Sequence, residues 1–201
     1  MKFRLQLVRH GKTYASVHSL YCGSTDIALC DKGVREVEEN VETNIYDSAE
    51  IYFTSGMKRT TETLSLICKD CTPVIIDDLK EMNFGDFEMK KHEELMDDKR
   101  YVNWIEQLDR GEDGKCPGGE SHDEFNERIK NGFEQLCHYI YKNGISSAML
   151  VAHGGTIGYI MLDYAQGFGS FYEAMPPQGR GYDVMVSFND NKISIDEYKR
   201  I

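Results

Sequence analysis

The stretch Leu7-Val8-Arg9-His10-Gly11-Lys12-Thr13 decides the fold, because it places a cation and an imidazole directly after an apolar run. Residues 3–8 have the composition of a buried β-strand. In an open α/β sheet, ligands bind beyond the carboxyl ends of the strands. Arg9 and His10 are therefore predicted to reach such a ligand-binding crevice.

Two further predicted strands end in a similar way. The run Met149-Leu150-Val151-Ala152 leads to His153-Gly154-Gly155 and to a helix expected near Thr156, whose free N–H groups suit an anion. The run Ile51-Tyr52-Phe53-Thr54 precedes a helix that carries Arg59, and a guanidinium matches phosphate geometry. The sequence therefore predicts that three strand ends converge on one anion.

Strands and helices alternate along the chain. Strands are expected at residues 3–8, 50–54 and 147–152, with a C-terminal hairpin that joins 182–188 to 193–198 through Asn189-Asp190-Asn191. Apolar residues have helical spacing at 34–45, 64–68 and 125–140, and Ser121 with Glu124 predicts a capping box. We expect an α/β three-layer sandwich with a mostly parallel mixed sheet, helices on both faces and an antiparallel C-terminal hairpin.

Two polar segments fit this core poorly. Residues 82–118 include Trp104 in a helical pattern, and residues 166–181 are rich in glycine and proline, as in a long loop. A chain of 201 residues is predicted to form a single domain, 1–201, in which these two insertion segments cover the site.

Composition excludes several classes of function. A net charge of −11 opposes the broad basic face that nucleic acids and anionic membranes require. Residues 1–7 lack the apolar run of a signal peptide, and no later window has the length needed to cross a bilayer. The six scattered cysteines are predicted to be reduced thiols, so we expect a cytoplasmic protein.

The chain resembles the histidine phosphatase, or phosphoglycerate mutase-like, superfamily in five blocks that keep the family's order. The blocks are Arg9-His10-Gly11, residues 54–59, residues 79–88, Gly119-Glu120-Ser121 and His153-Gly154-Gly155, which together span most of the chain. Gly118-Gly119-Glu120-Ser121 followed by Arg128 resembles the short phosphatase branch, which includes broad-specificity and α-ribazole phosphatases.

The resemblance implies a catalytic role for five residues. His10 would attack phosphorus and become phosphohistidine. Glu81 would protonate the leaving oxygen and then activate water. The phosphoryl oxygens would be held by Arg9, Arg59 and His153.

Four residues are implied as substrate-binding. Gly154 would lend a backbone N–H, while Ser16, Cys22 and Gly23 would line the phosphate site; Ser16 stands where asparagine is usual. Two guanidiniums and an imidazole can replace a divalent ion in phosphoryl transfer, so no metal and no cofactor is predicted.

The predicted function is metal-independent hydrolysis of small phosphate monoesters, with a small phosphorylated metabolite as the partner. The alternative is phosphoglycerate mutase-type phosphoryl transfer, for which the segment 82–118 is shorter than usual. A third reading is an inactive relative that binds phosphorylated ligands, although a binding protein needs neither a nucleophile nor an acid. The substrate and a homo-oligomeric state are left open by the sequence.

Overall fold

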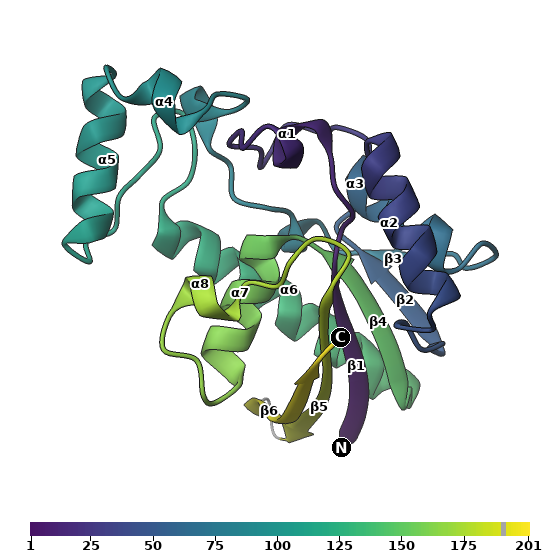
Figure 1. The fold of residues 1–201 in the computed structure, drawn as a ribbon. Helices are drawn as coiled ribbons and strands as arrows, with labels where there is room; N and C mark the ends of the chain where they lie inside the picture. The colour runs from purple at the N-terminus through teal and green to yellow at the C-terminus, as the bar shows by residue number, and fades with distance from the viewer. Residues whose placement is uncertain (190–191) are drawn as a thin grey trace.

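A mixed sheet of six strands forms the centre of the molecule, which a computed structural model describes over residues 1–189 and 192–201 (Figure 1). The strands are β1 (Lys2–Arg9), β2 (Ile51–Thr54), β3 (Val74–Ile75), β4 (Ser147–Ala152), β5 (Gly181–Asn189) and β6 (Lys192–Arg200). Their order across the sheet is β3-β2-β4-β1-β5-β6. The first four in this order are parallel, and β5 is antiparallel to both β1 and β6.

The predicted fold class is confirmed by this arrangement: the sheet is mostly parallel and ends in an antiparallel C-terminal pair. β1 and β2 begin within one residue of the predicted bounds, and β4 has the bounds that the sequence predicted. The predicted turn at 189–191 includes residues 190 and 191, which lie outside the described residues.

Helices lie on both faces of the sheet. They are α1 (Tyr14–Val17), α2 (Asp31–Glu42), α3 (Lys58–Ile67), α4 (His92–Leu95), α5 (Lys99–Asp109), α6 (His122–Asn143), α7 (Gly154–Tyr164) and α8 (Phe171–Ala174), with 3-10 turns η1 (Asp77–Leu79) and η2 (Gly85–Phe87). Figure 1 shows α2 and α3 on one side of the sheet, α7 and α8 on the other, and α5 standing away from it.

The alternation of side chains along the strands divides the apolar core in two. Leu5 and Leu7 of β1 belong to the larger cluster, together with the apolar stripe of α6 and α7. Val8, one residue on, belongs to a smaller cluster with Leu64 of α3 and Val151 of β4. Successive side chains of a strand point to opposite faces, so both faces of the central strands are covered.

Local signals set the helix ends. Ser121 accepts a hydrogen bond from the Glu124 amide and Glu124 accepts from the Ser121 amide, as the capping box predicts, and Gly144 ends α6 in the left-handed conformation. The pattern that included Ile45 extended α2 too far, since the helix ends at Glu42 and Asn44 has a positive φ of 55°.

Candidate active site

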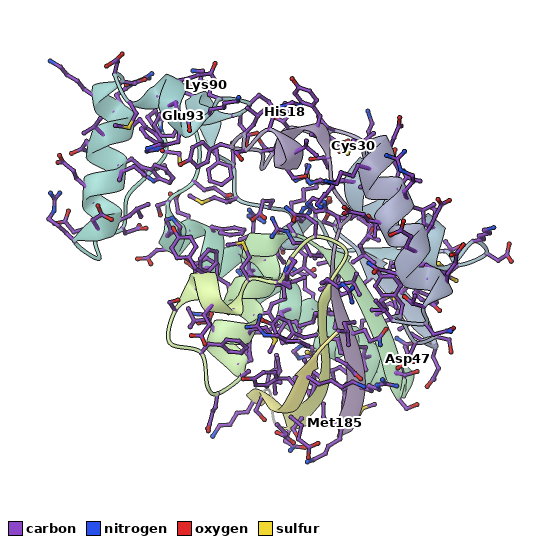
Figure 2. The ribbon with its side chains drawn as sticks, in the orientation of Figure 1. His18, Cys30, Asp47, Lys90, Glu93 and Met185 are labelled. Atoms are coloured by element: carbon purple, nitrogen blue, oxygen red, sulfur yellow. The ribbon has the colours of Figure 1, made fainter. Side chains whose placement is uncertain are left out.

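Three strands deliver the predicted residues to one edge of the sheet. Arg9 is the last residue of β1 and pairs with Ala152, the last residue of β4. The His10 amide donates to the Ala152 carbonyl at 3.0 Å, which places His10 and His153 side by side. The opposite end of the sheet, where Figure 2 labels Asp47 and Met185, carries none of the predicted site residues.

The imidazole of His10 is buried and held in one tautomer. Its Nδ1 lies 2.7 Å from the Gly11 carbonyl oxygen. Because a carbonyl can only accept, Nδ1 carries the proton and Nε2 keeps its lone pair. Burial, with the positive charges of Arg59 and Arg9, lowers the pKa of His10 to about 3. The ring is therefore neutral at physiological pH and has a free nucleophilic nitrogen.

His153 lies edge-on to His10, with ring centroids 5.3 Å apart. Its Nδ1 accepts from Arg59 Nε at 3.2 Å, so Nε2 carries the proton and donates to Ser55 Oγ at 2.8 Å. Ser55 lies 3.1 Å from Thr60 Oγ1, which in turn donates to the Met57 carbonyl. Burial, together with the positive charges of Arg59 and Arg9, keeps the pKa of His153 well below its ordinary value.

Arg59 is buried and Arg9 is half-buried, and both cations lack a carboxylate at ion-pair distance within the described residues. Arg59 donates to the carbonyls of Thr25 at 2.9 Å and Gly23 at 2.7 Å. Arg9 donates to the Pro176 carbonyl at 2.8 Å, and its buried Nε has no hydrogen-bond partner. Over residues 1–189 and 192–201, neither guanidinium forms an ion pair with a carboxylate. A desolvated cation is costly unless an anion pairs with it, so this site favours an anion.

Glu81 meets the first turn of α7. Its Oε2 accepts from the Gly155 amide at 2.9 Å, and its Oε1 accepts from the Met82 amide at 3.0 Å. A Cβ on Gly155 would lie 2.3 Å from Glu81 Oε1, and a Cβ on Gly154 would lie 2.7 Å from Arg9 Cζ. The two glycines therefore allow the acid and the cation to approach the start of the helix.

Arg128 of α6 holds the backbone that carries Glu81. It donates to the carbonyls of Asp78 at 2.8 Å, Lys80 at 2.9 Å and Glu81 at 3.2 Å, and it pairs with Glu120 through two bonds of 2.7 Å. The sequence marked Arg128 only through the resemblance. Its contacts could not be predicted, because they join residues up to 50 positions apart.

Glu88 ties the segment after Glu81 to a second loop. Its carboxylate accepts from the amides of Gly23, Ser24, Thr25 and Phe84, and from the Thr25 hydroxyl at 2.6 Å. Two carbonyls of the same 23–25 loop receive the Arg59 guanidinium. The sequence predicts a structural or pocket-lining role for Glu88, but its partners could not be predicted, since a glutamate carries no local signal of residues more than 60 positions away.

Three of the predicted substrate-binding residues, Cys22, Gly23 and Gly154, border this site, and the polar groups of several predicted residues already have partners. Ser16 Oγ donates to the Thr13 carbonyl at 2.9 Å and accepts from the Thr13 amide, as part of the α1 cap. The Gly23 amide donates to Glu88, and the Cys22 thiol contacts the Thr25 carbonyl at 3.6 Å.

His18, which lies outside the motif, is away from this site. Figure 2 labels His18 beside α1, where it is exposed and its ring is tilted at 41° against that of Tyr14. Within the described ranges, no group of three or more His, Cys, Asp or Glu is arranged to hold a metal ion. None of the helices that the structure describes is long and apolar enough to span a membrane.

Comparison with known proteins identifies the class to which this fold and site belong. The family model of the histidine phosphatase superfamily (branch 1) matches residues 5–199, so the chain belongs to that superfamily. The predictions of this family and of an enzyme of the phosphatase class are confirmed.

Individual relatives include both phosphatases and a mutase. The chain is 30% identical over 164 residues to the adenosylcobalamin/alpha-ribazole phosphatase of Escherichia coli K12, covering 79% of this chain and 77% of the relative. It is also 30% identical to the probable phosphoglycerate mutase GpmB of Escherichia coli O1:K1, covering 79% and 73%. The solved alpha-ribazole phosphatase of Shigella flexneri has the same fold, with a TM-score of 0.78 at 24% identity and coverage of 96% and 94%.

Proposed function

We propose that this protein hydrolyses small phosphate monoesters through a phosphohistidine on His10, without a metal ion. The observation that carries the proposal is a neutral imidazole with a free Nε2, placed beside the buried Arg59 and the half-buried Arg9, neither of which is ion-paired with a carboxylate of the described residues. A phosphate dianion supplies the missing negative charge, and its phosphorus then faces the nucleophile.

The first step transfers the phosphoryl group to the enzyme. The Nε2 lone pair of His10 attacks phosphorus, the bond from phosphorus to the ester oxygen breaks, and the proton of the Glu81 acid goes to that oxygen. Charge on the equatorial oxygens is stabilised by Arg9 and Arg59. The products are an alcohol and phosphohistidine, with Glu81 left as a carboxylate.

The second step returns the enzyme to its starting state. The Glu81 carboxylate accepts a proton from water as the water oxygen attacks phosphorus, and the N–P bond breaks back to His10. Among the proposed binding groups, the Gly154 amide would hold a phosphoryl oxygen, and His153 would do the same by exchanging its bond to Ser55 for one to phosphate. Ser16, Cys22 and Gly23 would contribute by exchanging their present partners for phosphate.

Phosphoglycerate mutase-type transfer is the second candidate, because GpmB is among the relatives. A mutase must hold a leaving group with its own carboxylate, which calls for a cation beyond the phosphate site. The cavity beside Arg9 and Glu81 has no such further cation among its described lining residues, and the two cations of the other cavity at Glu81, Lys80 and Arg128, are each paired with a carboxylate. This favours hydrolysis. An inactive phosphate-binding relative would not need the Gly11 carbonyl to fix the tautomer of His10.

We further propose a cytoplasmic protein, since all six cysteines are free thiols.

The test measures phosphate release from p-nitrophenyl phosphate and 3-phosphoglycerate by the wild type and by His10→Ala, with EDTA present. We expect chelator-resistant release that falls by at least about 10³-fold in the variant, because removing a nucleophile removes the covalent route. Transfer of phosphate between hydroxyls of glycerate without release would instead establish a mutase. Loss of activity in EDTA would contradict metal independence.

A further inference from the structure

A cavity of about 270 Å³ opens beside Arg9 and Glu81, where the alcohol of a phosphate monoester would leave. Its walls come from both polar segments of the sequence: Trp104, Ile105 and Leu108 of α5 on one side, and Phe171 and Tyr172 of α8 on the other. The volume is just below the ~300–1,000 Å³ of pockets for drug-sized ligands, so it suits a single small ring system.

Charge in this cavity is confined to the phosphate end. Of the residues lining it in the described part of the chain, only Arg9 and Glu81 are charged. His122 also lines it, but burial lowers the pKa of His122, so the ring is neutral at physiological pH. A charged group on the leaving alcohol would therefore be desolvated without a partner, which is costly.

Aromatic rings make up much of the wall, and the polar atoms of two of them, Tyr21 and Trp104, are already engaged. The rings belong to Tyr21, Phe84, Trp104, Phe125, Phe171 and Tyr172. The Tyr21 hydroxyl is bonded to the Tyr101 hydroxyl at 2.6 Å, and Trp104 Nε1 donates to the Gly114 carbonyl at 3.2 Å. The Trp104 and His122 rings are nearly parallel, at 16°. The wall therefore offers ring faces and edges, which favour a flat aromatic guest.

We propose that the leaving group of the substrate is aromatic and uncharged, and that Trp104, Ile105 and Leu108 of α5 determine this specificity. The inference rests on the proposed function, since it assigns the alcohol side of the same reaction.

A second cavity borders Glu81 on another side, but it does not offer a site for a charged leaving group. Its volume is about 450 Å³, and its cationic lining residues within the described ranges are Lys80 and Arg128. Lys80 is paired with Asp77 at 2.7 Å and Arg128 with Glu120 at 2.7 Å. Neither cation is free to receive a carboxylate or a second phosphate, which leaves the aromatic cavity as the better place for the leaving group.

The test compares esters whose alcohols have similar intrinsic reactivity, so that differences report the cavity and not the leaving group. Benzyl phosphate, ethyl phosphate and 4-carboxybenzyl phosphate form such a set. We expect kcat/KM for benzyl phosphate to exceed that of each of the other two by at least about tenfold, as burial of one ring requires. Equal kcat/KM values for the three esters would overturn the inference while leaving the proposed hydrolysis intact.

A variant tests the assigned wall directly. Ile105→Lys adds a cation to the cavity, and we expect it to raise the ratio of kcat/KM for 4-carboxybenzyl over benzyl phosphate by at least about fivefold. Val102→Lys is the matched control, because Val102 lies on the same helix, is exposed and does not line the cavity. An unchanged ratio in Ile105→Lys, or the same change in both variants, would contradict the assignment to α5.

Binding separates this inference from the proposed function. 2-Phenylethylphosphonate and propylphosphonate replace the ester oxygen of benzyl and ethyl phosphate with carbon, so neither can be hydrolysed. Calorimetry should give at least about tenfold tighter binding of the phenyl compound. If no ester is hydrolysed but this preference is found, the hydrolysis proposal fails and the aromatic site stands. Equal binding of the two phosphonates would overturn the inference.

Discussion

The neutral state of His10 results from its surroundings. An ordinary histidine has a pKa near 6.5, whereas burial and two neighbouring guanidiniums lower the pKa of His10 to about 3. The Gly11 carbonyl then fixes the proton on Nδ1. The lowered pKa and the fixed tautomer both arise from groups next to the end of β1: Gly11, Arg9 and Arg59. This local environment makes one imidazole a nucleophile although the protein as a whole is strongly acidic.

This shift predicts how stability depends on pH. Between pH 6.5 and pH 3 the unfolded chain binds a proton at residue 10 and the folded chain does not, so the free energy of unfolding decreases as pH falls. The contribution approaches about 1.4 kcal/mol per pH unit. Urea unfolding of His10→Gln from pH 7 to pH 4 should show a shallower decrease than the wild type, while His153 still contributes in the variant. Parallel pH dependences in the two proteins would contradict the buried neutral state.

Glu88 is predicted to act on phosphate binding without touching phosphate. Glu88→Gln replaces one acceptor oxygen with a donor that faces the loop amides, so the 23–25 loop and the Arg59 guanidinium loosen. We expect the inhibition constant for inorganic phosphate to rise about tenfold, which is the loss of about one charge-assisted hydrogen bond. Glu93→Gln, on the exposed face of α4 labelled in Figure 2, is the matched control and should leave this constant unchanged.

The sequence predicted some of these residues and not others for a physical reason. Arg9, His10 and His153 lie at or directly after the ends of apolar strands, and parallel strands bring their carboxyl ends to one edge of the sheet. Ser55 and Glu88 act through partners that lie far away in the chain, 98 residues for the Ser55 to His153 bond. No local pattern records such a partner, so their roles required coordinates.

The first turn of α7 begins with two glycines, and each makes room for a different side chain of the site. Gly154 lets Arg9 approach the helix, and Gly155 both donates its amide to Glu81 and leaves room for that carboxylate. The sequence placed the start of this helix near Thr156, whereas the helix begins at Gly154. Glycine is an unfavourable helix residue, and here the close approach of the two side chains requires it.

Two alanine variants at this helix start are predicted to differ in their effect. Gly155→Ala displaces Glu81, so kcat/KM should fall about 100-fold for benzyl phosphate, whose alcohol needs a proton, and much less for p-nitrophenyl phosphate. Gly154→Ala displaces Arg9 and should reduce kcat/KM for both esters by the same factor. Equal sensitivity of the two esters in Gly155→Ala would contradict the role of Glu81 as the acid.

The fold was predictable where elements are long and periodic, as in α6 with its capping box and in β4. The strand β3 was not predicted, because two residues cannot display an alternating pattern. Tertiary contacts also place this strand, since it pairs with β2 through Phe53 and Thr54. The three-layer arrangement was predictable from the alternation of the longer strands and helices. A missed strand of two residues does not alter that alternation.

For the whole molecule, a net charge of −11 surrounds a site built for an anion. The field at long range repels a phosphate dianion, while the two guanidiniums attract it only at short range. Since the Debye length shrinks from ~30 Å at 0.01 M to ~8 Å at 0.15 M salt, screening removes the repulsion first. We expect kcat/KM for benzyl phosphate to rise about twofold or more over this range in stopped assays of phosphate release. A fall with salt would show that the guanidiniums dominate the distant field.

Trp104 is the one tryptophan of the sequence, and α5 holds it at the wall of the aromatic cavity with its ring nearly parallel to His122. The tryptophan emission of the protein therefore comes from a single indole, which lines this cavity. Binding of a guest in this cavity can therefore be measured in the unmodified protein as a change in the fluorescence of Trp104, without a contribution from other tryptophans. Each turnover can then be followed by fluorescence as the alcohol arrives with its phosphate and departs without it.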